Sequence, residues 1–251
     1  MIKVLDKAFD ILEIMATEPC KELPLTNIAR STGVNKATAG RILKDLLDRG
    51  YACQTSQRGG YSLGPMAYRL PANGIFRKDI VDAASPLVAA CAKELRESVL
   101  VATLQHGRRY ILCHENGNPE LDIIIDKPFY DDLYVTATGR LLLAYAGEGE
   151  FNSYLAKHGM PLEKWDGIDR AAELVKSLAK IRNDSMISCK SPNRNLWILA
   201  FPIHVDDRVD AALGISVPVD SFQGERAETI IDAGRTTAGR ICEALLERHH
   251  R

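Results

Sequence analysis

Three apolar stripes at helical spacing occupy the first 50 residues, and the breaks between them limit the folds available to this part of the chain. A loop at 17–24 follows the first stripe, and Thr26 can cap a short second helix. Gly33 permits a tight turn before a third helix at 35–49. The pattern predicts a helix-turn-helix. The first stripe consists of Val4, Leu5, Ala8, Phe9, Ile11, Leu12 and Met15, and the third of Val34, Ile42, Leu43, Leu46 and Leu47.

The early positions of the third helix are candidates for base recognition. Side chains at the start of the second helix of such a pair reach base edges in the major groove. We expect the side chains at 36, 38, 39 and 41 to be exposed there. The candidate DNA-contacting residues of the helices are Thr26, Asn35, Lys36, Thr38, Ala39 and Arg41.

A β-hairpin is predicted directly after the third helix. Residues 51–54 and 61–63 have strand character, and a turn at 55–60 separates them. Arg58 stands beside Gly59 and Gly60 at the tip, where it can reach the DNA backbone or minor groove. Three helices followed by a hairpin give the order of a winged helix-turn-helix.

The charge distribution supports a double-stranded DNA operator as partner, although the net charge of the chain is −1. Residues 1–70 hold ten Lys and Arg against seven Asp and Glu, whereas the remainder holds 22 against 26. A local basic excess is what contact with phosphates requires. Two alternatives stay open: Arg41 and Lys44 can form an ordinary solvated helix face, and a winged helix can bind protein instead of DNA.

Other functional classes lack support in the sequence. The chain has no apolar run long enough for a membrane span and no signal peptide, so we expect a cytoplasmic protein without a membrane partner. Its six cysteines are scattered, and no nucleophile with a base, no zinc motif and no nucleotide-binding loop is present. His114 and Glu115 are best explained as exposed polar residues at a strand end. We therefore predict no enzyme activity, no catalytic or metal site, and no cofactor.

The rest of the chain predicts a second, larger domain. We expect domains at 1–70 and 86–251 joined by a linker at 71–85, with Ser85 capping a helix that starts at Pro86. Strands and helices then combine into an α+β fold with an antiparallel sheet. The expected strands are 99–105, 110–114, 121–126, 186–189, 196–204 and 211–219, and the expected helices are 139–146, 150–158, 170–183 and 225–251.

Several ordered motifs resemble those of the IclR family of transcriptional regulators. They lie at 25–30, 33–38, 41–43, 50–51 and 61–65 in the first domain and at 136–145, 181–182 and 199–202 in the second. The chain departs from the family pattern at Ala37, Gly40 and Arg140, where the family often has serine, histidine and lysine. Gly40 costs a helix about 1 kcal/mol relative to alanine and is compatible with close approach to DNA or with an altered sequence preference.

The resemblance implies a GAF-like or PAS-like sensing domain, a small-molecule effector of the organic-acid type, and a homodimer or homotetramer. A carboxylate suits the helix start at 136–139, where amide groups and the helix dipole favour negative charge. Ser188 stands where the family tends to carry an acidic residue, and Lys190 is close to it, which would suit a more anionic effector. The alternation of 196, 198 and 200 also fits an ordinary inward strand face. The candidate effector-binding residues are Ala137, Thr138, Ser188, Leu196, Ile198 and Ala200.

Overall fold

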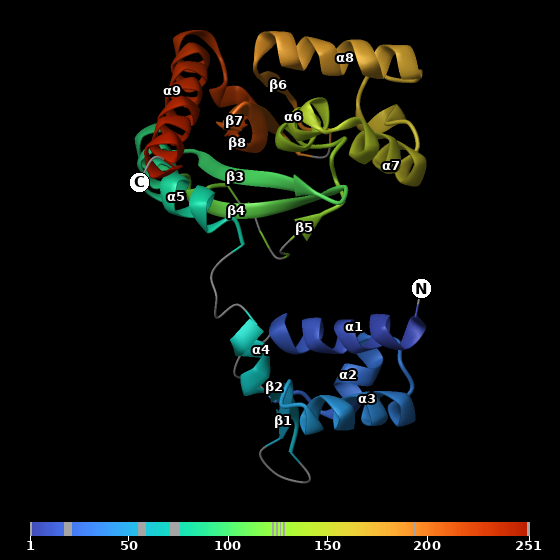
Figure 1. Ribbon diagram of the computed structural model, residues 1–251. Coiled ribbons are helices and arrows are strands. Elements are labelled where there is room, and N and C mark those ends of the chain that lie inside the picture. The colour runs from blue at the N-terminus through green and yellow to red at the C-terminus, as the bar shows by residue number, and fades with distance from the viewer. Residues whose placement is uncertain are drawn as a thin grey trace. The chain divides into compact units, whose positions relative to one another are not determined.

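The computed structural model describes residues 2–17, 22–54, 59–70, 76–121, 123, 125, 127, 129–192 and 194–249. The chain divides into two compact units, residues 1–75 and 76–251, which are described separately (Figure 1). The first unit contains the helix-turn-helix and the second contains an antiparallel sheet. The predicted α+β class is confirmed.

The first unit is a winged helix-turn-helix. Its helices α1 (Lys3–Thr17), α2 (Leu25–Ser31) and α3 (Lys36–Asp48) are followed by strands β1 (Ala52–Gln54) and β2 (Tyr61–Leu63) and by the short helix α4 (Pro65–Arg69). The two strands pair antiparallel as the predicted wing. Apolar residues from all three helices and β1 form one core, and Gly33 turns the chain between α2 and α3 with a φ of +64°.

The predicted cap of α2 is wrong. Pro24, and not Thr26, occupies the N-cap position, and no side chain caps this helix. The fixed φ of proline suits a helix start, so α2 begins at Leu25, whose side chain packs on the core. Thr26 therefore lies inside α2 with an exposed side chain.

The second unit is built on a sheet with the strand order β5-β4-β3-β8-β7-β6. Every pair of neighbouring strands is antiparallel. His106 and Gly107 join β3 to β4, and both have a positive φ, as a tight hairpin turn requires. The strands are β3 (Ser98–Gln105), β4 (Arg108–Asn116), β5 (Phe129–Tyr130), β6 (Ile187–Lys190), β7 (Leu196–Val205) and β8 (Arg208–Pro218).

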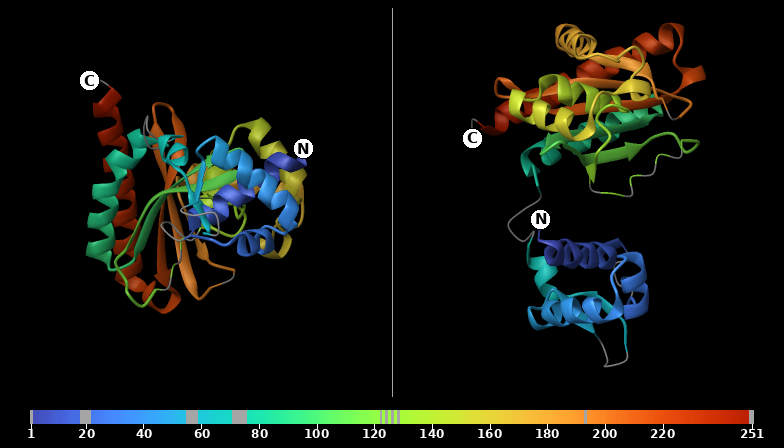
Figure 2. Two further views of the ribbon diagram at one scale, coloured as in Figure 1. Left: turned by 90° about the horizontal axis from the view of Figure 1, so that it is seen from below. Right: turned by 90° about the vertical axis from the view of Figure 1, so that its right-hand side faces the viewer.

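Helices cover both faces of this sheet (Figure 2). Leu199, Phe201 and Ile203 of β7 pack toward α5 (Lys78–Leu95) and α9 (Gly224–His249). The alternate residues Ile198 and Ala200 pack toward the opposite layer. That layer contains α6 (Ala137–Tyr145), α7 (Glu148–His158) and α8 (Ala171–Asp184). Two short 3₁₀ turns, Leu162–Lys164 and Val219–Ser221, complete the unit.

Helix α5 begins at Lys78, so the predicted start at Pro86 is wrong. Pro86 has no N–H to donate to the carbonyl of Asp82 one turn earlier. Arg248 of α9 donates to that carbonyl instead, at 3.3 Å. The Ser85 hydroxyl donates to the Val81 carbonyl at 2.8 Å and does not cap a helix. The helix can therefore continue through the proline because a neighbouring helix satisfies the carbonyl that it leaves without a partner.

The strand predicted at 121–126 is also wrong for the residues that the structure describes. Residues 121, 123 and 125 have no regular secondary structure. The strand that extends the sheet past β4 is β5, which pairs Phe129 with Tyr110 and Tyr130 with Arg109. The remaining predicted strands and helices are found, with ends shifted by a few residues at most.

Candidate nucleic-acid interface and ligand cavity

The start of α3 presents a polar surface. Lys36 and Arg41 are exposed, and the backbone N–H of Thr38 donates to the Asn35 side-chain oxygen at 2.8 Å. Asn35 is therefore the N-cap of α3, and it fixes where the exposed side chains begin. Thr38 is half-buried and Lys44, one turn after Arg41, is exposed. These residues make the start of α3 a basic and hydrogen-bonding surface.

Ala39 does not belong to that surface. Its side chain is fully buried and packs in the core with Ile42, Leu43 and Leu46. The prediction that it is exposed is wrong, because positions 39, 42, 43 and 46 share one side of a helix. Thr26 remains exposed on α2, outside the turn that precedes α3.

Gly40 leaves space on the surface of α3. A Cβ atom built at this position meets no atom within 4 Å. Packing inside the first unit therefore does not require a glycine here. No packing contact within the described residues explains the glycine at this position.

The wing is tied to the body of the first unit. The backbone N–H of Gly60 donates to a Glu22 carboxylate oxygen at 3.2 Å, and the Gln54 side chain donates to the Gly59 carbonyl at 2.8 Å. Leu23 and Tyr61 exchange two backbone hydrogen bonds of 2.8 Å. Arg58, the predicted contact at the tip, lies outside the described residues.

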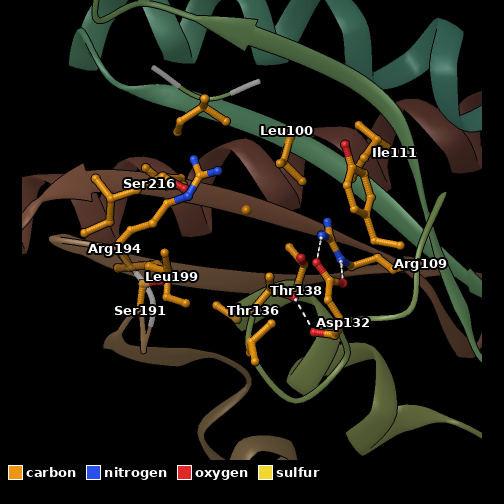
Figure 3. A pocket seen from close by; sticks show the side chains of 18 of the residues that line it. Leu100, Arg109, Ile111, Asp132, Thr136, Thr138, Ser191, Arg194, Leu199 and Ser216 are labelled. Carbon is orange, nitrogen blue, oxygen red and sulfur yellow. Dashed lines mark hydrogen bonds and ion pairs between the residues drawn. The ribbon is translucent and has the colours of Figure 1, made fainter. Parts of the chain in front are cut away.

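A cavity of about 400 Å³ opens in the second unit between the sheet and the start of α6 (Figure 3). Apolar side chains make up most of its wall, and polar groups lie at its two ends. The apolar residues are Leu100, Ile111, Ile123, Ile125, Val135, Ala137, Leu196, Ile198, Leu199 and Ile215. The polar and small residues are Arg109, Tyr130, Asp132, Thr136, Thr138, Ser191, Arg194, Gly214 and Ser216.

One end of the cavity holds an ion pair between a buried arginine and a half-buried aspartate. Arg109 donates from Nε and from a terminal nitrogen to the two carboxylate oxygens of Asp132, at 2.9 and 2.7 Å. The Arg109 guanidinium also lies 5.2 Å from the centre of the Tyr130 ring. Arg194, Ser191 and Ser216 stand at the other end (Figure 3).

The first turn of α6 lies between these two ends. Thr136 is its N-cap and accepts a hydrogen bond from the Gly139 N–H at 3.2 Å. The leading amide groups of a helix have no partner within the helix, and here they belong to Ala137 and Thr138, which line the cavity. The helix dipole adds a partial positive charge at this point. An anionic group is the ligand chemistry that this wall favours.

Close packing of α6 on the sheet depends on Gly214. A Cβ atom at this position would lie 2.6 Å from Cγ2 of Thr138 and 3.3 Å from a methyl carbon of Leu100. The glycine therefore lets the start of α6 approach strand β8 where both line the cavity.

Arg140 holds the loop before α6 through hydrogen bonds made outside the cavity. The side chain is buried and donates to the carbonyls of Tyr134 and Lys164 at 2.8 and 2.9 Å and to the Cys189 sulfur at 3.3 Å. Burial lowers the pKa of its guanidinium, which the nearby Cys189 partly offsets. Arg140 is not among the residues that line the cavity. The departure from the family pattern at this position therefore lies in the scaffold.

Four of the six predicted effector residues lie in the cavity wall: Ala137, Thr138, Leu196 and Ile198. Ser188 and Ala200 do not line it. The Ser188 hydroxyl accepts a hydrogen bond from the Trp197 indole, and Ala200 is buried in the core beneath α6.

Sequence reasoning missed the polar ends of the cavity. Arg109 stands directly after a hairpin turn, and Asp132 lies 23 positions later in a segment without a periodic pattern. No local signal brings these two residues together. The pairing of β4 with β5 does so.

Comparisons with known proteins agree on both units. Residues 4–56 match the IclR helix-turn-helix domain, and residues 73–243 match the C-terminal domain of the bacterial transcriptional regulator IclR. Similar proteins include the HTH-type transcriptional regulator TtgV of Pseudomonas putida, which is 24% identical over 92% of this chain and 81% of its own length. The HTH-type transcriptional regulator BhcR of Paracoccus denitrificans is 26% identical over 93% and 85%, respectively.

Solved structures show the same fold. An IclR homologue from Microbacterium hydrocarbonoxydans, in complex with 4-hydroxybenzoate, has a TM-score of 0.76 and 19% identity and covers 97% of this chain and 99% of its own. The Thermotoga maritima IclR structure has a TM-score of 0.72 and 22% identity, with coverage of 98% and 99%.

Proposed function

The chain belongs to the IclR family of bacterial transcriptional regulators, and we propose that α3 reads duplex DNA while the cavity beside α6 holds an organic acid that modulates this binding. The observation that carries the effector half of the proposal is the position of the α6 N-terminus in the wall of a largely apolar cavity. The relatives are transcriptional regulators, and we propose no enzyme activity for this chain. We also propose a cytoplasmic location, where a bacterial regulator meets its DNA.

The proposed DNA contacts are the exposed residues at the start of α3. Lys36 and Arg41 are long, exposed cationic side chains in the first two turns of α3, and the half-buried Thr38 between them in sequence offers a hydroxyl. Side chains at the start of a recognition helix read base edges, whereas a wing contacts the backbone or the minor groove. Thr26, which is exposed on α2, and Arg58 stay in the proposal as further DNA contacts.

The proposed effector is a carboxylic acid with an apolar body. Its carboxylate would lie at the first turn of α6, and its body would contact Leu196 and Ile198. The Arg109–Asp132 pair at one end can accept or donate hydrogen bonds to a hydroxyl group. The related protein complexed with 4-hydroxybenzoate supports this class, since that acid carries a carboxylate, an aromatic ring and a hydroxyl.

A second copy of the chain is the proposed partner of helix α1. The buried face of α1 includes Ile11 and Met15, but a second set of apolar side chains points to solvent. This set is Val4, Leu5 and Phe9, which are 55, 49 and 58% exposed, and Ile2 directly before the helix is 65% exposed. A single winged helix covers a short half-site, so pairing two copies lets a regulator read both halves of an operator.

Among the described residues, none of the helices combines the length and apolarity of a membrane span.

Two measurements test the proposed function. Fluorescence anisotropy with duplex DNA should show binding that weakens steeply as salt rises, because phosphate contacts release counterions. Thermal shift with a panel of small organic acids that includes 4-hydroxybenzoate should raise the melting temperature for acids with an apolar body. Absence of DNA binding at low salt would contradict the first half, and a flat response to every acid would contradict the second.

A further inference from the structure

Three aromatic rings connect the beginning of the second unit to the strand at the edge of its sheet. The ring of Phe76 lies 5.7 Å from that of Tyr110, and the ring of Tyr110 lies 5.6 Å from that of Phe129, measured between centroids. We call Phe76, Tyr110 and Phe129 the aromatic ladder. Phe76 is the first residue of the second unit, directly after the residues that join it to the DNA-binding unit. The ladder therefore begins where the connection between the units ends.

The ladder and the cavity occupy opposite faces of the same short strand pair. Tyr110 pairs with Phe129 and Arg109 pairs with Tyr130 across β4 and β5. Neighbouring residues of a strand point to opposite faces. Tyr130 and Arg109 accordingly line the cavity, while Phe129 and Tyr110 stack in the ladder. A displacement of β5 would move both faces together.

β5 depends on side-chain contacts for its position. It is two residues long and lies at the edge of the sheet, so it has few backbone hydrogen bonds to hold it. On the ladder side, the Phe129 ring contacts Tyr110 and also the Arg108 guanidinium, which lies 4.3 Å from the ring centre. One aromatic pair changes a local equilibrium by about 2- to 10-fold. Loss of one ring contact should therefore change the local opening of this strand by a measurable factor.

The ladder is separate from the cores of the unit. None of its three rings belongs to either core cluster of the second unit, and Phe76 is 48% exposed. The next residue, Arg77, has a positive φ of 50° and pairs with Asp210 at 3.3 Å, which fixes the chain directly after Phe76. Phe76 thus gains its contact with the fold through the ladder, at a point that Arg77 anchors.

We propose that the aromatic ladder couples the cavity wall to the connection between the units. A ligand that fixes Tyr130 and Arg109 would also fix β5, and through Phe129 and Tyr110 it would restrict Phe76. The same contacts act in both directions, so removal of the Phe76 ring should also loosen the cavity wall. This inference rests on the proposed effector site, but the reciprocal effect can be measured without any ligand.

The test is amide hydrogen exchange on the full chain without ligand. Phe76→Ala should raise exchange of the amides at 129–132 by about 2- to 10-fold, because the ring that supports Tyr110 is lost. Tyr110→Phe retains the ring and should leave exchange unchanged, whereas Tyr110→Ala should raise it. Tyr68→Ala, an exposed aromatic residue on α4 of the first unit, is the matched control and should have no effect at 129–132. Unchanged exchange in Phe76→Ala overturns the proposal.

A second arm separates this inference from the proposed function. With 4-hydroxybenzoate at saturation, the wild-type chain should show slower exchange at 129–132 and a changed affinity for duplex DNA. In Phe76→Ala the acid should still bind, but its effect on DNA affinity should shrink by at least about 2-fold. If the wild-type chain ignores the acid, the proposed effector class fails, and the ligand-free comparison still decides the ladder. If Phe76→Ala keeps the full effect on DNA affinity, the ladder proposal fails while the effector site stands.

Discussion

Arg109 donates two hydrogen bonds, of 2.9 and 2.7 Å, to the carboxylate of Asp132, and the Arg109 side chain is only 7% exposed. The pair joins the second strand of the unit to the loop that leads into α6. Thr136, four residues after Asp132, donates its hydroxyl to the Asp132 carbonyl at 3.4 Å. Asp132 therefore connects Arg109 in the cavity wall to Thr136, the N-cap of α6.

Removal of the Asp132 carboxylate should destabilise the second unit. Asp132→Ala leaves a buried guanidinium without its partner, and such a change costs about 3 kcal/mol. Urea denaturation of the full chain, followed by circular dichroism, measures the loss. The exposed Asp220→Ala is the control and should change stability by less than about 0.5 kcal/mol. The double variant Arg109→Met/Asp132→Leu should recover part of the loss, and an Asp132→Ala variant as stable as the control would contradict the role of this pair.

Two glycines of the helix-turn-helix should respond in opposite directions to alanine. Gly40→Ala should stabilise the first unit by about 1 kcal/mol, because the new methyl group enters open space in the middle of α3. Gly33→Ala should destabilise it by about 1 kcal/mol, because Gly33 has a φ of +64°. Thermal unfolding of both variants measures the difference. A stabilised Gly40→Ala with weaker DNA binding would locate the reason for this glycine at the DNA, whereas a destabilised one would contradict the open environment.

Arg41→Ala should weaken binding to duplex DNA by about 10-fold while leaving the melting temperature unchanged. The side chain is exposed, so its removal leaves no gap in the core. If Arg41 contacts a phosphate, its removal should also make the plot of log affinity against log salt less steep, by about one unit of slope. Lys180→Ala, which removes a 79% exposed cation from α8, is the matched control and should bind DNA as the wild-type chain does. Equal affinity of Arg41→Ala and the control would remove Arg41 from the interface.

Stability should fall at mildly acidic pH partly because of His158. Among the described residues, the Nε2 atom of His158 is buried without a hydrogen-bond partner, and its ring stacks on Tyr154 at 4.3 Å. Burial, followed by the charge of Lys157, lowers the pKa of His158 below that of free histidine. The unfolded chain therefore binds more protons than the folded chain as the pH falls. The stabilising contribution is complete above about pH 6.5 and is lost as the pH drops through the folded-state pKa.

Denaturation at pH 7 and pH 5 checks this assignment. His158→Phe keeps a ring against Tyr154 but cannot titrate, so it should lose less stability between the two pH values than the wild-type chain. Part of the loss should remain, because burial also lowers the pKa of His114, which bonds Ser98 at 2.9 Å. An identical loss in both proteins would exclude His158 as a contributor.

Local patterns in the sequence were sufficient for most of the fold. The apolar stripes, the turn at Gly33 and the paired turn residues His106 and Gly107 each require only neighbours along the chain. The burial of Ala39 could also have been predicted, since Ala39 lies on the same side of the helix as Ile42 and Leu46. The passage of α5 through Pro86 could not, because the carbonyl that this proline leaves without a helical partner is satisfied by Arg248, 162 positions away in the chain.

The cavity was also predictable only where local patterns determine it. Ala137 and Thr138 follow from the start of α6, and Leu196 and Ile198 follow from the alternation of β7. Arg109 and Asp132 meet only because β5 pairs with β4, and the two residues of β5 are too few to give a periodic signal. Long-range pairing, rather than local propensity, thus determined the polar chemistry of the site.

Gly214 limits how a cavity of this design can be adapted to new compounds. Any side chain there would meet Thr138 at the start of α6 before it met a ligand. A library that retargets the protein as a biosensor should therefore hold position 214 fixed. Variation is better placed at Ile111 of β4 and at Leu196 and Ile198 of β7, which line the cavity from other strands. Gly214 thus serves the packing of the fold, whereas the larger side chains of the cavity wall can determine which acid is bound.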